Sequence, residues 1–258
     1  LNEEKMKKKI LVMALAAALP YAAMAGSSIG TVTVDGNTTV PSFDPDITVG
    51  SDAAQTVEIT GSNNPALRID DTSTATATIL GKQITLTSAS DGEGFGDAVE
   101  ALAGNIANLG NASSKSVRLD GTRYGAIASG GTVNITADDV IVNGGETGLW
   151  AQNSETDRGE IHIDAKNVNI KAKKGGVLSL KSDVSIAAST LNVETNTGAA
   201  LHVQNNTETE IAPADRATLT VVADNIDLRS NAIGISSYSN GKMNISGELI
   251  TIDAPTAI

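Results

Sequence analysis

One pattern of apolar residues recurs six times along this chain, and five of the six copies follow one another almost directly. The pattern is apolar-x-apolar-x-small-x-x-apolar-x-apolar, where x is any residue. The six copies run over 77–86, 133–142, 161–170, 184–193, 219–228 and 243–252. Self-similarity of this kind is the signature of a repeat architecture, so it constrains the fold more strongly than any single residue does.

Within each copy the apolar residues lie two apart, which is the periodicity of a β-strand. A small residue such as Ala137 separates two short strands, and polar pairs such as Asp138-Asp139 follow it. Asp and Asn are common at such a bend because they tolerate left-handed backbone. A third short strand is predicted after a further small residue, which in five of the units is Gly92, Gly148, Gly176, Ala199 or Gly234.

Two weaker units fit the same frame, around Val57-x-Ile59 and Val117-x-Leu119. The last apolar positions of all the units are then 59, 86, 119, 142, 170, 193, 228 and 252, and three of the seven intervals are 23 or 24 residues. A coil of that length with three strands places equivalent residues in columns only if successive coils stack in parallel. The sequence therefore predicts an all-β fold, a single-stranded parallel β-helix of about eight coils over residues 53–258, right-handed by the general preference of parallel crossovers.

The first 25 residues resemble an export signal. Lys7-Lys8-Lys9 precedes an apolar stretch that is too short to span a bilayer, and Ala23-Met24-Ala25 is a small-x-small cleavage site. We expect cleavage between Ala25 and Gly26, with Met6 as the start and residues 1–5 as an upstream extension. A membrane anchor is the alternative for this segment. Residues 26–52 form a lead-in or cap before the first coil.

The chain is acidic, with a formal net charge of −12, and it contains no cysteine. Removal of the leader increases the negative charge, because four lysines and only two glutamates lie in it. Such a chain repels nucleic acid and anionic lipid. We therefore expect no nucleic-acid partner.

Three segments interrupt the repeat. Val99, Leu102, Ile106 and Leu109 fall at helical spacing, and Asp97 with Glu100 fits a capping box, which predicts a short helical insertion over 97–109. Polar loops are expected at 152–159 and 204–216. Ligand contacts on solenoids often lie in such side loops.

The sequence offers little support for catalysis. His162 and His202 should point outward from their strands, and neither has neighbours at metal-ligand spacing. The outward carboxylates do not form a column, since Lys166 and Ser189 lie between Asp138 and Asp224 in the repeat. We expect no catalytic residue, metal site or cofactor. The candidate ligand contacts are the three aromatic residues near the third strands of their coils, namely Tyr124, Trp150 and Tyr238.

The export signal, the absence of cysteine, the acidic Thr/Asn/Gly-rich coils and units such as Ala223-Asp224-Asn225-Ile226 followed by Gly234-Ile235 resemble the passenger domains of autotransporters, the pertactin-like adhesins of Gram-negative bacteria. The resemblance covers residues 53–258 and implies a right-handed β-helix, display at the cell surface, and adhesion or self-association. It also implies a C-terminal translocator in the outer membrane. We expect this chain to be the N-terminal piece of a longer protein.

Two other hypotheses stay open at this point. A secreted polysaccharide lyase or hydrolase could use the same scaffold, with carboxylates on adjacent coils as its acid and base. A fibre component would be indicated by trimeric assembly. The surface rod is favoured because the sequence consists mostly of repeat.

Overall fold

The computed structural model describes residues 31–35, 38–39, 46–61, 65–70, 74–89, 96–205 and 216–258. The expected leader and its cleavage site at Ala25 and Gly26 lie outside these residues, as do Gly92 and most of the second polar loop. The described parts of the lead-in, β1 (Thr31–Asp35), β2 (Thr38–Thr39) and β3 (Asp46–Gly50), are strands that pair with the following coil.

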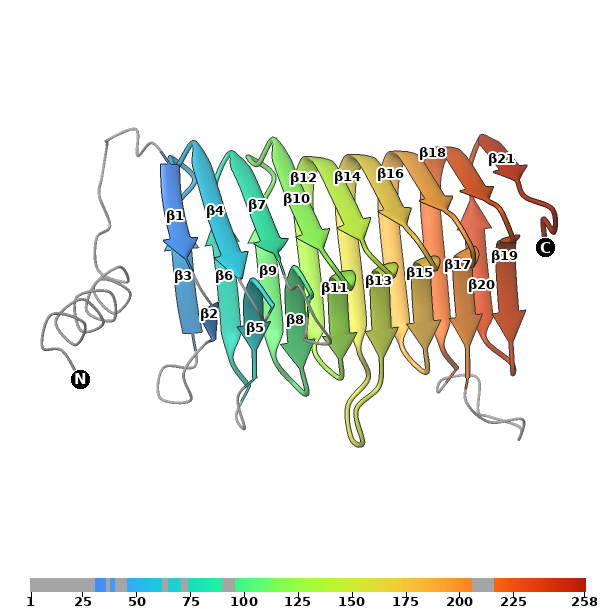
Figure 1. Cartoon of the computed structure of the whole chain (residues 1–258), viewed down its shortest axis with the longest axis horizontal. Coiled ribbons are helices and arrows are strands. Elements are labelled where there is room, and N and C mark those ends of the chain that lie inside the picture. The colour runs from blue at the N-terminus through green and yellow to red at the C-terminus, as the bar shows by residue number, and fades with distance from the viewer. Residues whose placement is uncertain are drawn as a thin grey trace, which may run out of the picture.

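The chain winds into a parallel β-solenoid of about seven turns, in which every pairing between these strands is parallel (Figure 1). The small sheet has eight strands: β2, β5 (Leu67–Ile69), β8 (Val99–Leu102), β11 (Tyr124–Ser129), β13 (Thr147–Gln152), β15 (Gly175–Leu180), β17 (Ala199–Gln204) and β19 (Ile233–Tyr238). The all-β parallel solenoid predicted from the repeat is confirmed. The eight units predicted from the sequence supply eight equivalent positions, and seven turns of the solenoid separate the first of these from the last.

The large sheet has thirteen strands and forms the other two sides of the coil. They are β1, β3, β4 (Thr56–Gly61), β6 (Thr76–Leu80), β7 (Gln83–Ser88), β9 (Ile106–Gly110), β10 (Ser116–Gly121), β12 (Thr132–Gly144), β14 (Glu160–Ala172), β16 (Asp183–Thr195), β18 (Thr218–Ser230), β20 (Lys242–Ser246) and β21 (Leu249–Asp253). In the middle coils a single 13-residue strand runs through the predicted corner.

The corner shifts the phase of the strand by one residue. In β12 the buried positions are Val133, Ile135 and Ala137 before the corner, and Val140 and Val142 after it. The strictly alternating side chains of a strand would otherwise turn to the outside after the bend. The polar pair at the corner therefore lets both halves of the strand face one core.

The predicted columns are present in the hydrogen-bonded register. The eight last apolar positions pair in succession as Ile59, Leu86, Leu119, Val142, Ile170, Val193, Leu228 and Ile252. The first seven are at most 1 % exposed. Each rung thus covers the aliphatic side chains of the next, and the interior is one continuous hydrophobic core.

The predicted helix over 97–109 is wrong. This segment forms β8, a turn at Ala103-Gly104, and β9, and the described part of the chain contains no helix. Ala107 and Leu109 are the buried pair of β9, in register with Val133 and Ile135, whereas Ile106 points outward. The repeat was obscured because Leu109 and Val117 are eight residues apart, while Ile135 and Val140 are five apart.

Small residues are required where each coil enters the small sheet. A Cβ on Gly148 would lie 2.4 Å from Ile170 Cγ2 and 2.7 Å from the Gly176 carbonyl oxygen. The equivalent positions in the next two coils are Gly176 and Ala200, since Leu149 pairs with Val177 and Val177 with Leu201, so the predicted position Ala199 is one residue early. Backbone of the neighbouring rung approaches this position too closely for a larger side chain.

Substitution of a core residue in a central rung tests the stacking. Val168 is fully buried in β14, and Val168→Asp places an unpaired carboxylate in the core. We expect the free energy of unfolding to fall by at least about 3 kcal/mol, measured by chemical denaturation. Asn153→Asp in the exposed loop is the control and should change it by less than about 0.5 kcal/mol. Equal loss in both variants would contradict the stacked core.

Candidate ligand-binding face

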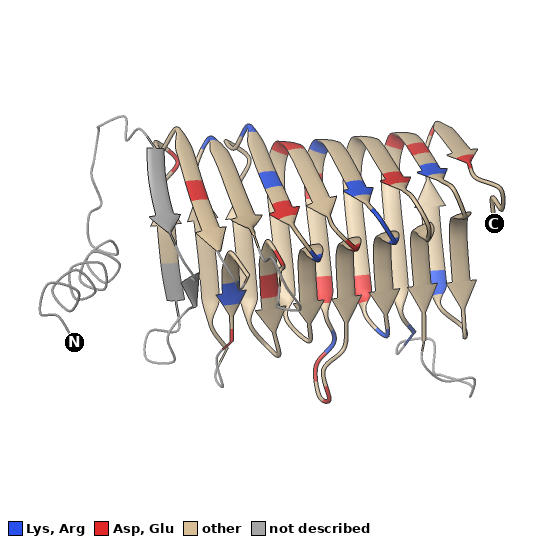
Figure 2. Cartoon of the chain, in the orientation of Figure 1, with Lys and Arg blue, Asp and Glu red and all other residues tan. Residues whose placement is uncertain are grey.

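The outer surface of the small sheet differs from the rest of the rod because it carries no charge over five consecutive strands. Strands β11, β13, β15, β17 and β19 contain no Asp, Glu, Lys or Arg. Figure 2 shows these strands free of red and blue. We call this surface the aromatic face, defined by Tyr124, Ile127, Trp150, Leu178, Leu180, His202 and Tyr238. It spans about 19 Å along the rod at a rung spacing of 4.7–4.9 Å.

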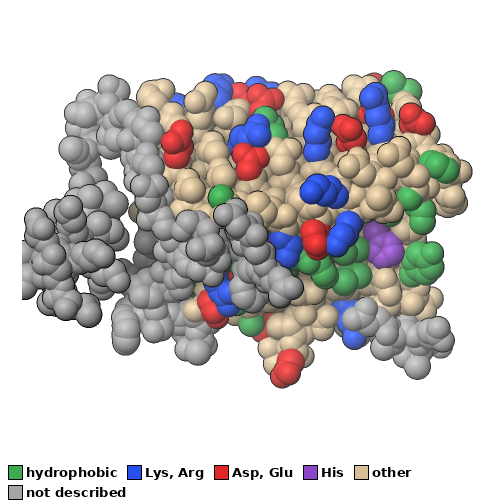
Figure 3. Space-filling view, in the orientation of Figure 1, with side chains coloured by type: hydrophobic (Ala, Val, Ile, Leu, Met, Phe, Trp, Pro, Cys, Tyr) green, Lys and Arg blue, Asp and Glu red, His purple; other side chains and the backbone are tan. Residues whose placement is uncertain are grey.

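Register places most of these side chains in two outward columns. The first runs through Ile127, Trp150, Leu178 and His202, and the second through Gln152, Leu180, Gln204 and Tyr238. Ile127, at the N-terminal end of the first column, is itself buried, with 4 % of its surface exposed. In the space-filling view hydrophobic side chains gather beside a histidine on this side of the molecule (Figure 3).

Two of the three predicted aromatic contacts lie together. The Tyr124 and Trp150 rings meet edge to face, with centroids 4.6 Å apart and an interplanar angle of 72°. The Arg123 guanidinium carbon lies 4.4 Å from the centre of the Tyr124 ring. Tyr124 is only 7 % exposed, and this burial raises its pKa to about 12. Tyr124 thus orients its neighbours, while the half-buried Trp150 offers the accessible ring surface.

The third aromatic residue lies apart from this pair. Tyr238 is three strands further along the rod, is 56 % exposed, and its ring is 5.7 Å from that of His202. His202 Nδ1 and Nε2 lie 2.6 Å from Ser236 Oγ and 3.1 Å from Gln204 Oε1. Burial lowers the pKa of His202, so the ring is neutral at pH 7. Leu178 and Leu180 of β15 fill the interval between the two aromatic groups.

A cluster of charged side chains that the sequence did not predict lies at the N-terminal end of this face. Arg123 donates two hydrogen bonds to Asp97, with Nε 2.9 Å from Oδ1, and Arg68 Nη1 lies 3.3 Å from Glu100 Oε2. Asp97 and Glu100 are 0 % and 4 % exposed. Burial raises the pKa of both carboxyls, opposed mainly by Arg123 at Asp97 and by Arg68 at Glu100.

The helix prediction is the reason that this cluster was missed. Asp97 and Glu100 fit a capping box, whereas in the structure Glu100 occupies the outward column, paired with Arg68 on one side and Ile127 on the other. Alignment of Val99 with Leu149 and Val177 as the third strand of its coil would have placed Glu100 beside Arg68.

At the corner within the large sheet, the Asp138 carboxylate is paired with two lysines. Asp138 lies 2.7 Å from Lys115 Nζ and 2.8 Å from Lys166 Nζ, one rung to either side. These hydrogen bonds lower the pKa of Asp138 to about 2. Across the described residues, no group of three or more His, Asp or Glu side chains is arranged to hold a metal ion.

No protein-family model matches this chain, and no curated protein or solved structure matches it either. In the part of the chain that the structure describes, no helix has the length and apolar character needed to cross a membrane.

Substitution of Arg123 tests how much its ion pair with Asp97 contributes to the stability of the fold. Arg123→Met leaves the buried Asp97 carboxylate without its bidentate partner. Because Arg123 is itself about a quarter exposed, we expect a loss near the lower end of the usual range, about 3 kcal/mol, measured by denaturation at pH 7. Asp97→Asn in the same chain should recover part of the loss. No recovery would contradict the pairing.

The burial of Glu100 predicts how the stability of the fold depends on pH. Its folded-state pKa is raised by burial, so the folded protein binds this proton more tightly than the unfolded chain, and the group destabilises the fold as pH rises through its folded pKa. Glu100→Gln should therefore raise the melting temperature at pH 7, and the difference should vanish at about pH 3, where both states are protonated. If Glu100→Gln still raised the melting temperature at about pH 3, the ionisation of Glu100 could not be the cause.

Proposed function

We propose that this protein is an exported, surface-displayed β-helical rod, the passenger part of an autotransporter, which acts in adhesion or self-association. The observation that carries the proposal is the uncharged aromatic face along one side of the rod, in a chain whose net charge is −12. The leader-like first 25 residues and the resemblance of the coils to adhesin passengers support the same function.

On the large sheet, several polar side chains bond to one another. Asn side chains bond across rungs, as Asn192 does to Asn169 at 2.9 Å and Asn134 to Asn108 at 2.9 Å. On the aromatic face Trp150 is half-buried, with part of its ring accessible, and Tyr238 is largely exposed. A surface ligand with apolar patches, either a glycan or a protein, would complement this face.

The alternative function is that of a secreted polysaccharide lyase or hydrolase. It is favoured by Asp97 and Glu100, two neighbouring carboxyls whose pKa values are raised by burial. Both carboxyls are ion-paired with arginines, however, and an acid or base needs contact with substrate. Release of reducing sugar or of unsaturated uronide from polysaccharides, lost in Glu100→Gln, would favour the enzyme.

Export is tested in a Gram-negative host. The chain should be recovered outside the cytoplasm with Gly26 as its first residue, measured by fractionation and mass spectrometry. A variant without residues 6–25 should stay in the cytoplasm. Equal distribution of the two forms would contradict the export proposal.

Adhesion is tested with purified protein on beads or on bacterial and host cell surfaces. Trp150→Ala should reduce attachment about tenfold, since stacked aromatic anchors dominate such contacts. Val222→Ala is the matched control, because Val222 is an exposed apolar residue of the large sheet. Equal attachment of the wild type and Trp150→Ala would contradict a role of the aromatic face in adhesion. This holds whether or not the protein self-associates in sedimentation.

A further inference from the structure

A second surface feature runs along the corner where the large sheet passes into the small sheet. Three hollows of about 390, 310 and 580 Å³ lie next to one another there. Glu194 lines all three hollows, Lys171 lines two, and Arg229 lines two. We call them together the corner trough, which extends from Gly121 to Pro255.

The trough is built from one column of polar side chains. Asn143, Lys171, Glu194, Arg229 and Asp253 pair in succession across neighbouring rungs. Each rung therefore contributes one hydrogen-bonding side chain at a spacing of 4.7–4.9 Å, and the column is parallel to the rod axis.

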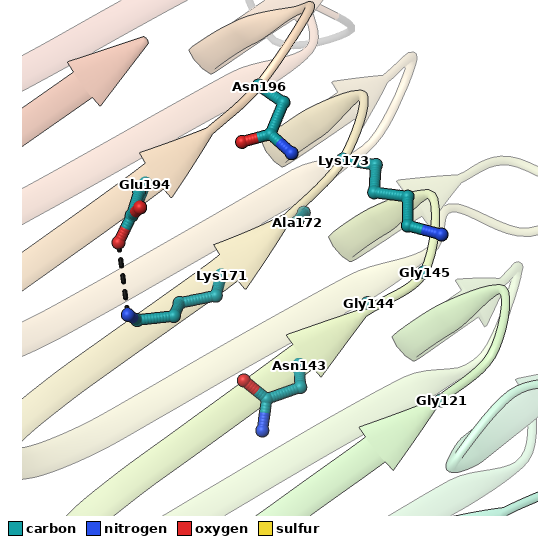
Figure 4. A pocket seen from close by; sticks show the side chains of 9 residues that line it. All are labelled: Gly121, Asn143, Gly144, Gly145, Lys171, Ala172, Lys173, Glu194 and Asn196. Carbon is teal, nitrogen blue, oxygen red and sulfur yellow. Dashed lines mark ion pairs between the residues drawn. The ribbon is translucent and has the colours of Figure 1, made fainter.

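The charges within the trough balance. Lys171 Nζ lies 3.1 Å from Glu194 Oε2, and Arg229 Nη2 lies 2.7 Å from Asp227 Oδ2. In Figure 4 the Lys171–Glu194 pair lies between the amides of Asn143 and Asn196. The trough thus presents alternating donors and acceptors without an excess of either sign.

Two exposed groups that line the first of these hollows have no partner in the described part of the chain. Neither the Lys173 ammonium nor the Asn196 side-chain amide makes a hydrogen bond or ion pair there, although both line the same hollow. These groups lie on adjacent coils and are available to a ligand. Together they offer donors and an acceptor, as hydroxyl groups require.

We propose that the corner trough binds a neutral polysaccharide chain lying along the rod axis. A chain of hydroxyl-bearing sugar units presents a donor and acceptor set that repeats along its length, as the trough does. The balanced charges of the trough and the net charge of −12 disfavour an anionic polymer. This site is separate from the aromatic face, and the proposal depends on neither export nor adhesion.

The test uses the purified full chain and soluble polysaccharides in affinity electrophoresis and calorimetry. The probes are dextran, galactomannan and maltooligosaccharides of increasing length, with polygalacturonate and heparin as anionic polymers. We expect binding to at least one neutral probe, with an affinity that rises with oligosaccharide length. Lys173→Met with Asn196→Ala should weaken this binding about tenfold, because two hydrogen-bonding groups are lost.

The matched control is Asn153→Ala with Lys242→Met, which makes the same two changes away from the trough and should retain full affinity. Three results would overturn the proposal: binding to anionic polymers alone, binding to none of the probes, or equal affinity in the trough and control variants. Loss of binding in Trp150→Ala with none in the trough variant would assign the glycan to the aromatic face instead. Thermal melting of each variant shows that its fold is intact.

Discussion

The structure depends on the in-register stacking of aliphatic side chains between parallel rungs. Val140, Val168 and Leu191 lie in one such column, fully buried, and each contacts its equivalents above and below. A single coil cannot bury these residues, so the hydrogen bonds and the core of every rung are supplied by its neighbours. Ile250, at the same core position in the last described rung, is 42 % exposed, because none of the described rungs packs on its outer side.

Stacking in register also determines the outer surface. Any outward residue lies about 4.8 Å from its equivalents on the adjacent coils, so surface properties occur as columns along the rod. Asn side chains on adjacent rungs hydrogen-bond to each other, as Asn192 does to Asn169. In the column through Lys171 and Glu194, positive and negative side chains alternate. On the aromatic face all the outward columns lack Asp, Glu, Lys and Arg over five consecutive strands.

Most of the fold could be predicted because the repeat is expressed in residue spacing. The column from Ile59 to Ile252 was assigned correctly over its whole length. The error fell at 97–109, where the three additional residues between Leu109 and Val117 broke the spacing and let four apolar residues imitate a helix. A period of 3.6 and a period of two are hard to distinguish over so short a segment, and only pairing with Val133 and Ile135 decides it.

For the candidate site the sequence identified residues but not their arrangement. It named Tyr124, Trp150 and Tyr238, and the structure brings only the first two into contact. The sequence did not predict the charged cluster formed by Arg68, Asp97, Glu100 and Arg123. Its residues come from three coils and are brought together only in the folded chain. The sequence by itself determined which residues face the core, since hydrophobic periodicity is local. The tertiary structure alone decided which outward residues are neighbours, since that depends on loop lengths that shift the register of one coil against the next.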